Sequence, residues 1–113
     1  MPDWKEEFEN EIQRALEVRA RGNEGQARVC ARRAAGAAIR EYLTRRGRPV
    51  PSPSAYDLLN LIASDETLDP DLRQSAVYLS MRVTEEFKLP VAVDLVEEAR
   101  RLANLLLPPE TGA

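Results

Sequence analysis

An alanine-rich stretch without proline runs from Asn23 to Gly47 and constrains the fold more than any other part of the sequence. Asn23 is a good N-cap, because its side chain can accept from first-turn backbone N–H groups, and Gln26 stands where a capping box has Glu or Gln. Gly47 is a typical helix stop. Gly22 can end a preceding helix, since glycine reaches positive φ without a steric clash. The pattern predicts one helix of about 22 residues, about 33 Å long.

Small residues mark one face of this helix. They are Ala27, Ala31, Ala34, Ala35 and Ala38, with Cys30 beside them and Ile39, Tyr42 and Leu43 beyond. A thin apolar stripe lets a neighbouring backbone come close, so we predict that the helix lies in the middle of a bundle or at a contact between subunits. Gly36 reflects either such a close approach or a tolerated weak point. Cys30 is predicted to be a buried, inert thiol.

Capping residues and prolines delimit four further helices. Their predicted ranges are Asp3–Arg21, Ala55–Ala63, Pro70 to about Phe87, and Pro90–Leu106. The proline-rich segment from Arg48 to Pro53 is predicted to be a stiff, extended connector. No segment has the alternation of a strand. We therefore predict an all-α fold, an antiparallel up-and-down helical bundle of four long helices plus one short helix, forming a single domain over residues 1–113.

Composition indicates the class of protein and the compartment in which it works. Of the 113 residues, 43% are hydrophobic and 31% are charged, which is typical of a globular protein. No run of about 18 apolar residues occurs, so we predict no membrane span. The first residues are acidic where a signal peptide is basic and then apolar, and a lone cysteine suits a reducing compartment. These features favour a cytoplasmic protein.

The sequence contains no histidine, which removes the commonest general base and the commonest metal ligand. The adjacent carboxylates of Glu85–Glu86 and Glu97–Glu98 diverge on a helix, which disfavours a shared metal. Serines and acids are plentiful, but no nucleophile has an evident base. We predict no catalytic residues, no metal and no cofactor.

Positive charge is concentrated in the middle of the chain. From Arg14 to Arg48 there are ten arginines and three glutamates, whereas the whole chain has a net charge of −3. The candidate phosphate ligands on the second helix are Arg28, Arg32 and Arg40, which share one stripe, and Arg33, one step round it. The alternative is that these arginines pair with the acidic first and fourth helices. Tyr42 and Tyr56 either stack on bases or pack in the core or at its rim.

The order of these features resembles the HEPN families of small helical-bundle proteins. The matching segments are RARGN at the end of the first helix, ARVCARRAAGAAIREYLTRRG, SAYDLLNLI, and VDLVEEARRLANLLL. The resemblance implies an up-and-down bundle that forms a homodimer. Many HEPN proteins are RNases whose signature is an arginine followed four to six residues later by a histidine. In RVTEEF, Arg82 matches the arginine and Phe87 stands at the histidine position, so the resemblance does not imply RNase activity here.

HEPN members without the histidine serve as binding subunits, often beside a small nucleotidyltransferase. The resemblance thus implies a non-catalytic module with a nucleotidyltransferase partner protein, or a nucleotide or RNA, bound through the basic second helix. Arg82 is a fifth candidate contact to phosphate. The alternative is a purely structural or assembly protein whose arginines are paired internally, without a nucleic-acid role.

Overall fold

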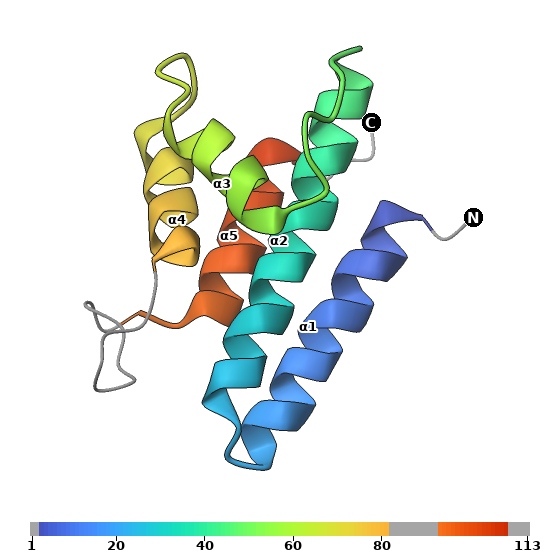
Figure 1. Ribbon diagram of the computed structural model, residues 1–113, viewed down its shortest axis with the longest axis vertical. Coiled ribbons are helices and arrows are strands. Elements are labelled where there is room, and N and C mark those ends of the chain that lie inside the picture. Colours follow the sequence, from blue (N-terminus) through green and yellow to red (C-terminus); the bar gives the residue numbers. More distant parts are fainter. Residues whose placement is uncertain (1–2, 82–92, 109–113) are drawn as a thin grey trace.

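The computed structural model describes residues 3–81 and 93–108 and shows five helices in them, with no strand. The helices are α1 (Trp4–Ala20), α2 (Glu24–Arg45), α3 (Ala55–Ala63), α4 (Pro70–Ser80) and α5 (Leu95–Leu106) (Figure 1). The all-α prediction is confirmed. With 17 and 22 residues, α1 and α2 are the longest of the described helices. None of the described helices has the length and apolar character needed to cross a membrane.

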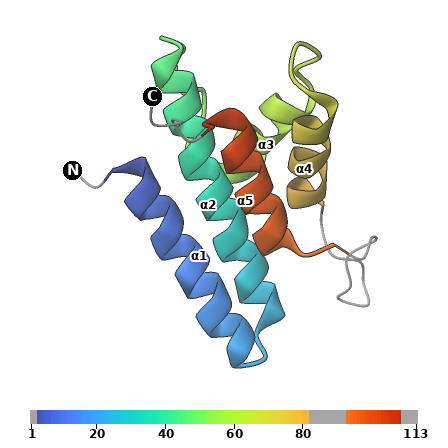
Figure 2. The same ribbon diagram turned by 180° about the vertical axis from the view of Figure 1, so that it is seen from behind.

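Helix α2 lies in the middle of the molecule and contacts each of the other four helices. Figures 1 and 2 show α1 and α5 along its sides, and α3 starts beside the middle of α2 and runs away from it. The alanines of the predicted stripe are all fully buried, as are Ile39 and Leu43 beyond them. Small side chains on α2 therefore allow several helices to pack around one axis, and of the two predicted locations the interior of the bundle is the one observed.

Local capping chemistry sets most helix ends. Gly22 follows the end of α1 with a φ angle of 83°, the left-handed conformation predicted for it, and Gly47 follows the end of α2 in the same conformation with a φ angle of 66°. The Asn23 side chain accepts a hydrogen bond from the Gln26 backbone N–H at 3.0 Å. The Gln26 side chain does not complete the capping box, because its amide lies 4.0 Å from Cys30 Sγ and donates there.

Helix α4 is shorter than predicted. It starts at Pro70 behind the Asp69 N-cap, as expected, but ends at Ser80, and Met81 is extended with φ −66° and ψ 138°. At this end of α4, Arg32 from α2 donates hydrogen bonds to the carbonyl groups of Leu79 and Met81. The predicted continuation to Phe87 lies outside the described residues.

Helix α5 begins at Leu95 behind the Asp94 N-cap, and Pro90, its predicted first residue, lies outside the described residues. A buried hydrogen bond joins α4 to α5, in which the Ser75 hydroxyl donates to Glu98 Oε2 at 2.7 Å. The neighbouring Glu97 is exposed, so the two adjacent glutamates do point to different environments.

The close approach predicted at Gly36 is present. A Cβ atom on this buried glycine would lie 3.4 Å from the Ala55 Cβ and 3.5 Å from Arg40 Nη1. These are ordinary van der Waals distances, so the site is tight without demanding glycine. The start of α3 thus lies directly against the middle of α2, and Ala55 of this contact also lines the candidate site.

Candidate anion-binding pocket

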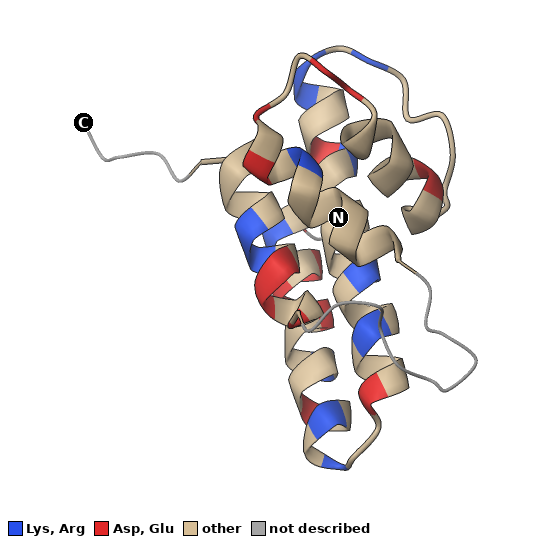
Figure 3. Cartoon of the chain, turned by 90° about the vertical axis from the view of Figure 1, so that its left-hand side faces the viewer, with Lys and Arg blue, Asp and Glu red and all other residues tan. Residues whose placement is uncertain are grey.

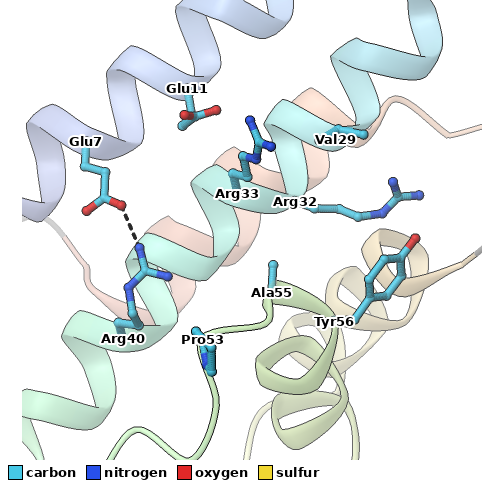
Figure 4. A pocket seen from close by; sticks show the side chains of 9 residues that line it. All are labelled: Glu7, Glu11, Val29, Arg32, Arg33, Arg40, Pro53, Ala55 and Tyr56. Carbon is cyan, nitrogen blue, oxygen red and sulfur yellow. Dashed lines mark hydrogen bonds and ion pairs between the residues drawn. The ribbon is translucent and has the colours of Figure 1, made fainter.

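A pocket of about 390 Å³ opens between α1, α2 and the beginning of α3 (Figure 4). Helix α1 contributes two glutamates, α2 contributes three arginines and a valine, and the connector before α3 and its first turn contribute the rest. The lining residues are Glu7, Glu11, Val29, Arg32, Arg33, Arg40, Pro53, Ala55 and Tyr56. The volume lies within the range of small-molecule sites.

The first turn of α3 faces this pocket. Ser54 is its N-cap, and the Ser54 hydroxyl accepts from the Asp57 backbone N–H at 3.4 Å. Ser52 holds the connector in place, because its hydroxyl donates to Asp57 Oδ2 and also accepts from the Ser54 N–H. The prolines before it keep the chain extended, so α3 starts where the connector ends. A helix N-terminus carries partial positive charge and backbone N–H groups that favour anions.

Arg33 and Arg40 extend from α2 toward α1 (Figure 4). Arg40 Nη2 lies 2.6 Å from Glu7 Oε1, and both side chains are partly exposed. Arg33 is exposed and makes no ion pair or hydrogen bond with any side chain of residues 3–81 and 93–108. One arginine of the pocket is therefore shared with a carboxylate, whereas the other retains its hydrogen-bonding capacity for a ligand.

Arg32 extends away from these two, toward Tyr56 (Figure 4). It is only 9% exposed. Its Nε donates to the Leu79 carbonyl at 2.8 Å and its Nη2 donates to the Met81 carbonyl at 3.0 Å. Its guanidinium also lies over the Tyr56 ring, 5.1 Å from the centroid. These contacts join α2, α3 and the end of α4, so Arg32 forms a wall of the pocket and acts chiefly in the fold.

The other two predicted arginines lie elsewhere. Arg28 is half-buried on α2 and is not among the lining residues. Arg82 lies outside the described residues. Of Tyr42 and Tyr56, the two tyrosines considered from the sequence, Tyr42 is 7% exposed within the core. The Arg46 guanidinium lies 5.0 Å from its ring centroid. Its burial agrees with packing and leaves no face for a base.

Sequence reasoning missed Glu7 and Glu11 as site residues. The signal available was their spacing of four on α1, which places both on one face of that helix. It also missed the contribution of the α3 N-terminus, for which the Ser54 N-cap was the sign. The pocket is therefore mixed in charge. The glutamates of α1 form one wall, and the arginines of α2 with the N-terminus of α3 form the other.

Figure 3 shows basic and acidic residues on the same helices, so neither sign of charge covers this side of the molecule alone. Arg45 pairs with Glu41 at 2.7 Å on α2. Arg19 binds Glu24 and Asp94, each at 3.0 Å, and so ties the end of α1 to the start of α2 and to the N-cap of α5. Internal pairing of arginines, the alternative drawn from the sequence, thus accounts for some of the positive charge but not for Arg33 or Arg28 within the described residues.

Cys30 is fully buried. Burial, followed by the negative charge of Glu11, raises the pKa of its thiol, so the thiol is protonated at neutral pH and is a poor nucleophile. Within the part of the chain that the structure describes, no group of three or more potential ligands is placed to hold a metal ion.

The Arg19–Asp94 contact predicts a pH dependence of stability. Burial alone raises the pKa of Asp94, but the hydrogen bond and charge of Arg19 and two backbone N–H groups of α5 outweigh it, so the pKa is lowered. A lowered folded-state pKa stabilises the fold above the usual value of about 4, and this contribution is lost as the pH falls through the folded value.

Replacing Asp94 with asparagine keeps an N-cap acceptor but removes the charge. We expect Asp94→Asn to lower the free energy of unfolding by about 0.5–1 kcal/mol at pH 7, the upper range of a partly exposed ion pair. The difference from the parent should shrink below about pH 4, where the parent carboxylate becomes protonated. Urea unfolding of both proteins across this pH range measures it, and a difference that stays constant down to the lowest pH would contradict the assignment.

Comparison of the chain with protein-family models, with curated proteins and with solved structures gave no match.

Proposed function

We propose that this chain is a non-catalytic binding module that holds a phosphate group of a nucleotide or of RNA in the pocket between α1, α2 and α3. The observation that carries the proposal is the convergence of Arg33 and Arg40 with the N-terminal turn of α3 on one cavity. Guanidinium groups bind phosphate oxygens in pairs, and a helix N-terminus adds backbone donors to the same anion.

In this proposal Arg33 is the principal contact, because it lies exposed in the pocket wall without an ion-pair partner in the described chain. Arg40 joins it when the ligand phosphate competes with Glu7 for the guanidinium. Arg32 holds the wall in place through its bonds to the α4 carbonyl groups. The sequence contains no histidine, the commonest general base, which suits a protein that holds a ligand without cleaving it.

The HEPN-like character of the chain is part of the same proposal, on the strength of the sequence segments given above. It includes an antiparallel up-and-down arrangement of four long helices plus one short helix, a homodimer, and a small nucleotidyltransferase as partner protein. Light scattering tests the assembly: a particle of twice the chain mass is expected, and a strict monomer at micromolar concentration would remove the homodimer from the proposal.

The binding proposal is tested with a labelled, 5′-phosphorylated single-stranded RNA of mixed sequence, titrated with the full chain at low and at physiological salt. We expect measurable affinity at low salt that falls as salt rises, because phosphate contacts release counterions. Arg33→Ala should weaken binding about tenfold, as expected for the loss of charged hydrogen bonds.

Arg28→Ala is the matched control, since Arg28 lies on the same helix, lacks a described partner and does not line the pocket. It should leave the affinity within about twofold of the parent, which corresponds to the small effect of a residue outside the contact. Equal losses in the two variants, or no binding at low salt, would overturn the pocket as the phosphate site.

A purely structural role is the second candidate, and a specific contact favours it. The 2.6 Å contact between Arg40 and Glu7 closes α1 onto α2 without any ligand. If this pair only stabilises the helix hairpin, Glu7→Gln should weaken the fold slightly and leave RNA binding unchanged. If the pocket holds phosphate, the same variant should bind RNA more tightly, because Arg40 no longer has an internal carboxylate.

A further inference from the structure

Arg33 and Arg40, the two arginines assigned to the phosphate, each lie near a carboxylate of α1. Arg40 Nη2 is 2.6 Å from Glu7 Oε1. Figure 4 shows the Arg33 guanidinium beside Glu11, which lines the same pocket. A phosphate that enters the pocket therefore meets two negative charges as well as two positive ones, and it must draw Arg40 away from Glu7.

This arrangement favours one class of phosphate over another. A phosphodiester within an RNA strand has a single negative charge, so it brings no more charge to Arg40 than the Glu7 carboxylate that it displaces. A phosphomonoester carries a charge of about −1.5 to −2 near neutral pH and has three oxygens that accept hydrogen bonds. Attraction to the guanidinium groups grows with the charge of the ligand, whereas separating Glu7 from Arg40 costs the same for both ligands. The monoester therefore offsets that cost more fully.

The start of α3 provides a further donor for a phosphate with three free oxygens. The Ser54 hydroxyl accepts from the Asp57 N–H, but the Ala55 N–H has no hydrogen-bond acceptor within the described residues. Ala55 also lines the pocket. Arg40 approaches this turn, because its Nη1 and the Ala55 Cβ lie 3.5 and 3.4 Å from the place that a Cβ on Gly36 would take. Two guanidinium groups and a helix N-terminus thus supply donors for more oxygens than a diester leaves unesterified.

The acidic wall of the pocket also disfavours a strand that continues past it. A phosphate within a strand has further phosphates on both sides, whereas a terminal phosphate has them on one side only. Glu7 and Glu11 of α1 repel these neighbouring phosphates, since like charges repel at short range. A strand that ends in the pocket brings fewer phosphates to this wall than a strand that passes through it.

We propose that the pocket selects a terminal phosphomonoester, as found at the 5′ end of an RNA or on a mononucleotide, over the phosphodiesters within a strand. This inference rests on the proposed phosphate site and adds to it the class of phosphate that is bound. Arg33 and Arg40 bind the additional charge of the monoester. Glu7 and Glu11 raise the charge that a ligand needs in order to bind.

The test compares three 3′-labelled RNAs of one mixed sequence that differ only at the 5′ end. One carries a phosphate, one a hydroxyl, and one a methyl phosphate, which is a diester of nearly the same size. The phosphate RNA should bind the full chain about tenfold more tightly than either of the others, the effect expected of added charged hydrogen bonds. In Arg33→Ala this preference should fall to about twofold or less, whereas Arg28→Ala, the matched control outside the pocket, should keep it.

Competition with AMP and with adenosine distinguishes the two sources of a monoester. If AMP displaces the phosphate RNA and adenosine does not, the monoester of a free nucleotide is sufficient for binding. If neither displaces it while the preference for the phosphate RNA holds, the ligand is the end of an RNA strand.

The remaining outcomes separate this inference from the proposed function. Equal affinities for the three RNAs, all weakened by Arg33→Ala, would overturn the selection of a monoester and support a site for internal phosphates. Equal binding of the phosphate and methyl phosphate RNAs, both tighter than the hydroxyl RNA, would also overturn it, because the second charge would then have no effect. A preference that is unchanged in Arg33→Ala would place the monoester outside the pocket, and both proposals would fail. Both also fail if none of the RNAs binds at low salt.

Discussion

Replacement of Arg32 by methionine is expected to lower the free energy of unfolding by about 3 kcal/mol, which corresponds to a fall in Tm of roughly 10–20 °C for a chain of this size. Methionine fills much of the arginine volume but donates no hydrogen bond. The Leu79 and Met81 carbonyl groups would lose the donors that lie 2.8 and 3.0 Å away, and the Tyr56 ring would lose its cation. The expected loss is large because the side chain is only 9% exposed, so water replaces these contacts poorly.

Thermal and urea unfolding followed by far-UV circular dichroism measure this effect. Arg28→Met is the matched control, one turn earlier on α2, and should change stability by less than about 0.5 kcal/mol. Arg32→Lys should lie between the control and Arg32→Met, since a single ammonium group cannot serve two carbonyl groups and also lie flat on a ring. A loss below about 1 kcal/mol in Arg32→Met would show that the α4 end does not depend on this arginine.

The helix ends that the sequence predicted correctly are those decided by nearby residues. Asn23, Ser54 and Asp69 cap the helices that follow them, and Gly22 and Gly47 take the left-handed conformation after the helices they end. Each of these signals acts within one turn, so a local pattern contains it. The end of α4 is different. The carbonyl group of Met81 there accepts a hydrogen bond from Arg32, which lies 49 residues earlier in the chain. No local pattern around Ser80 contains that contact.

The candidate site was predicted in part for a related reason. The spacing of four placed Arg28, Arg32 and Arg40 on one stripe, and a stripe on an exposed helix would face one ligand. Helix α2 is instead surrounded, so arginines one turn or two turns apart meet different neighbours: Arg40 meets Glu7 on α1, and Arg32 meets the end of α4. Arg33, placed off the stripe by the sequence, is the one left open to the pocket.

The buried alanines of α2 cannot be replaced by larger side chains without loss of stability. Ala35 lies in the middle of the helix, is fully buried, and belongs to a core to which all five helices contribute. Close packing leaves no room for added carbon atoms, because the surrounding backbones belong to several helices that hold one another in place. An added side chain must displace a helix or adopt a strained rotamer.

Ala35→Leu is therefore expected to lower the free energy of unfolding by about 3 kcal/mol, although leucine is more hydrophobic than alanine and forms helices almost as well. Thr44→Leu, at an exposed position near the end of the same helix, introduces the same side chain without a neighbour to displace and should stay within about 0.5 kcal/mol of the parent. Urea unfolding of the three proteins separates the effect of volume from that of hydrophobicity. If Ala35→Leu matched or exceeded the stability of the parent, α2 would have unfilled space around it, and the close approach of its neighbours would not be the reason for its alanines.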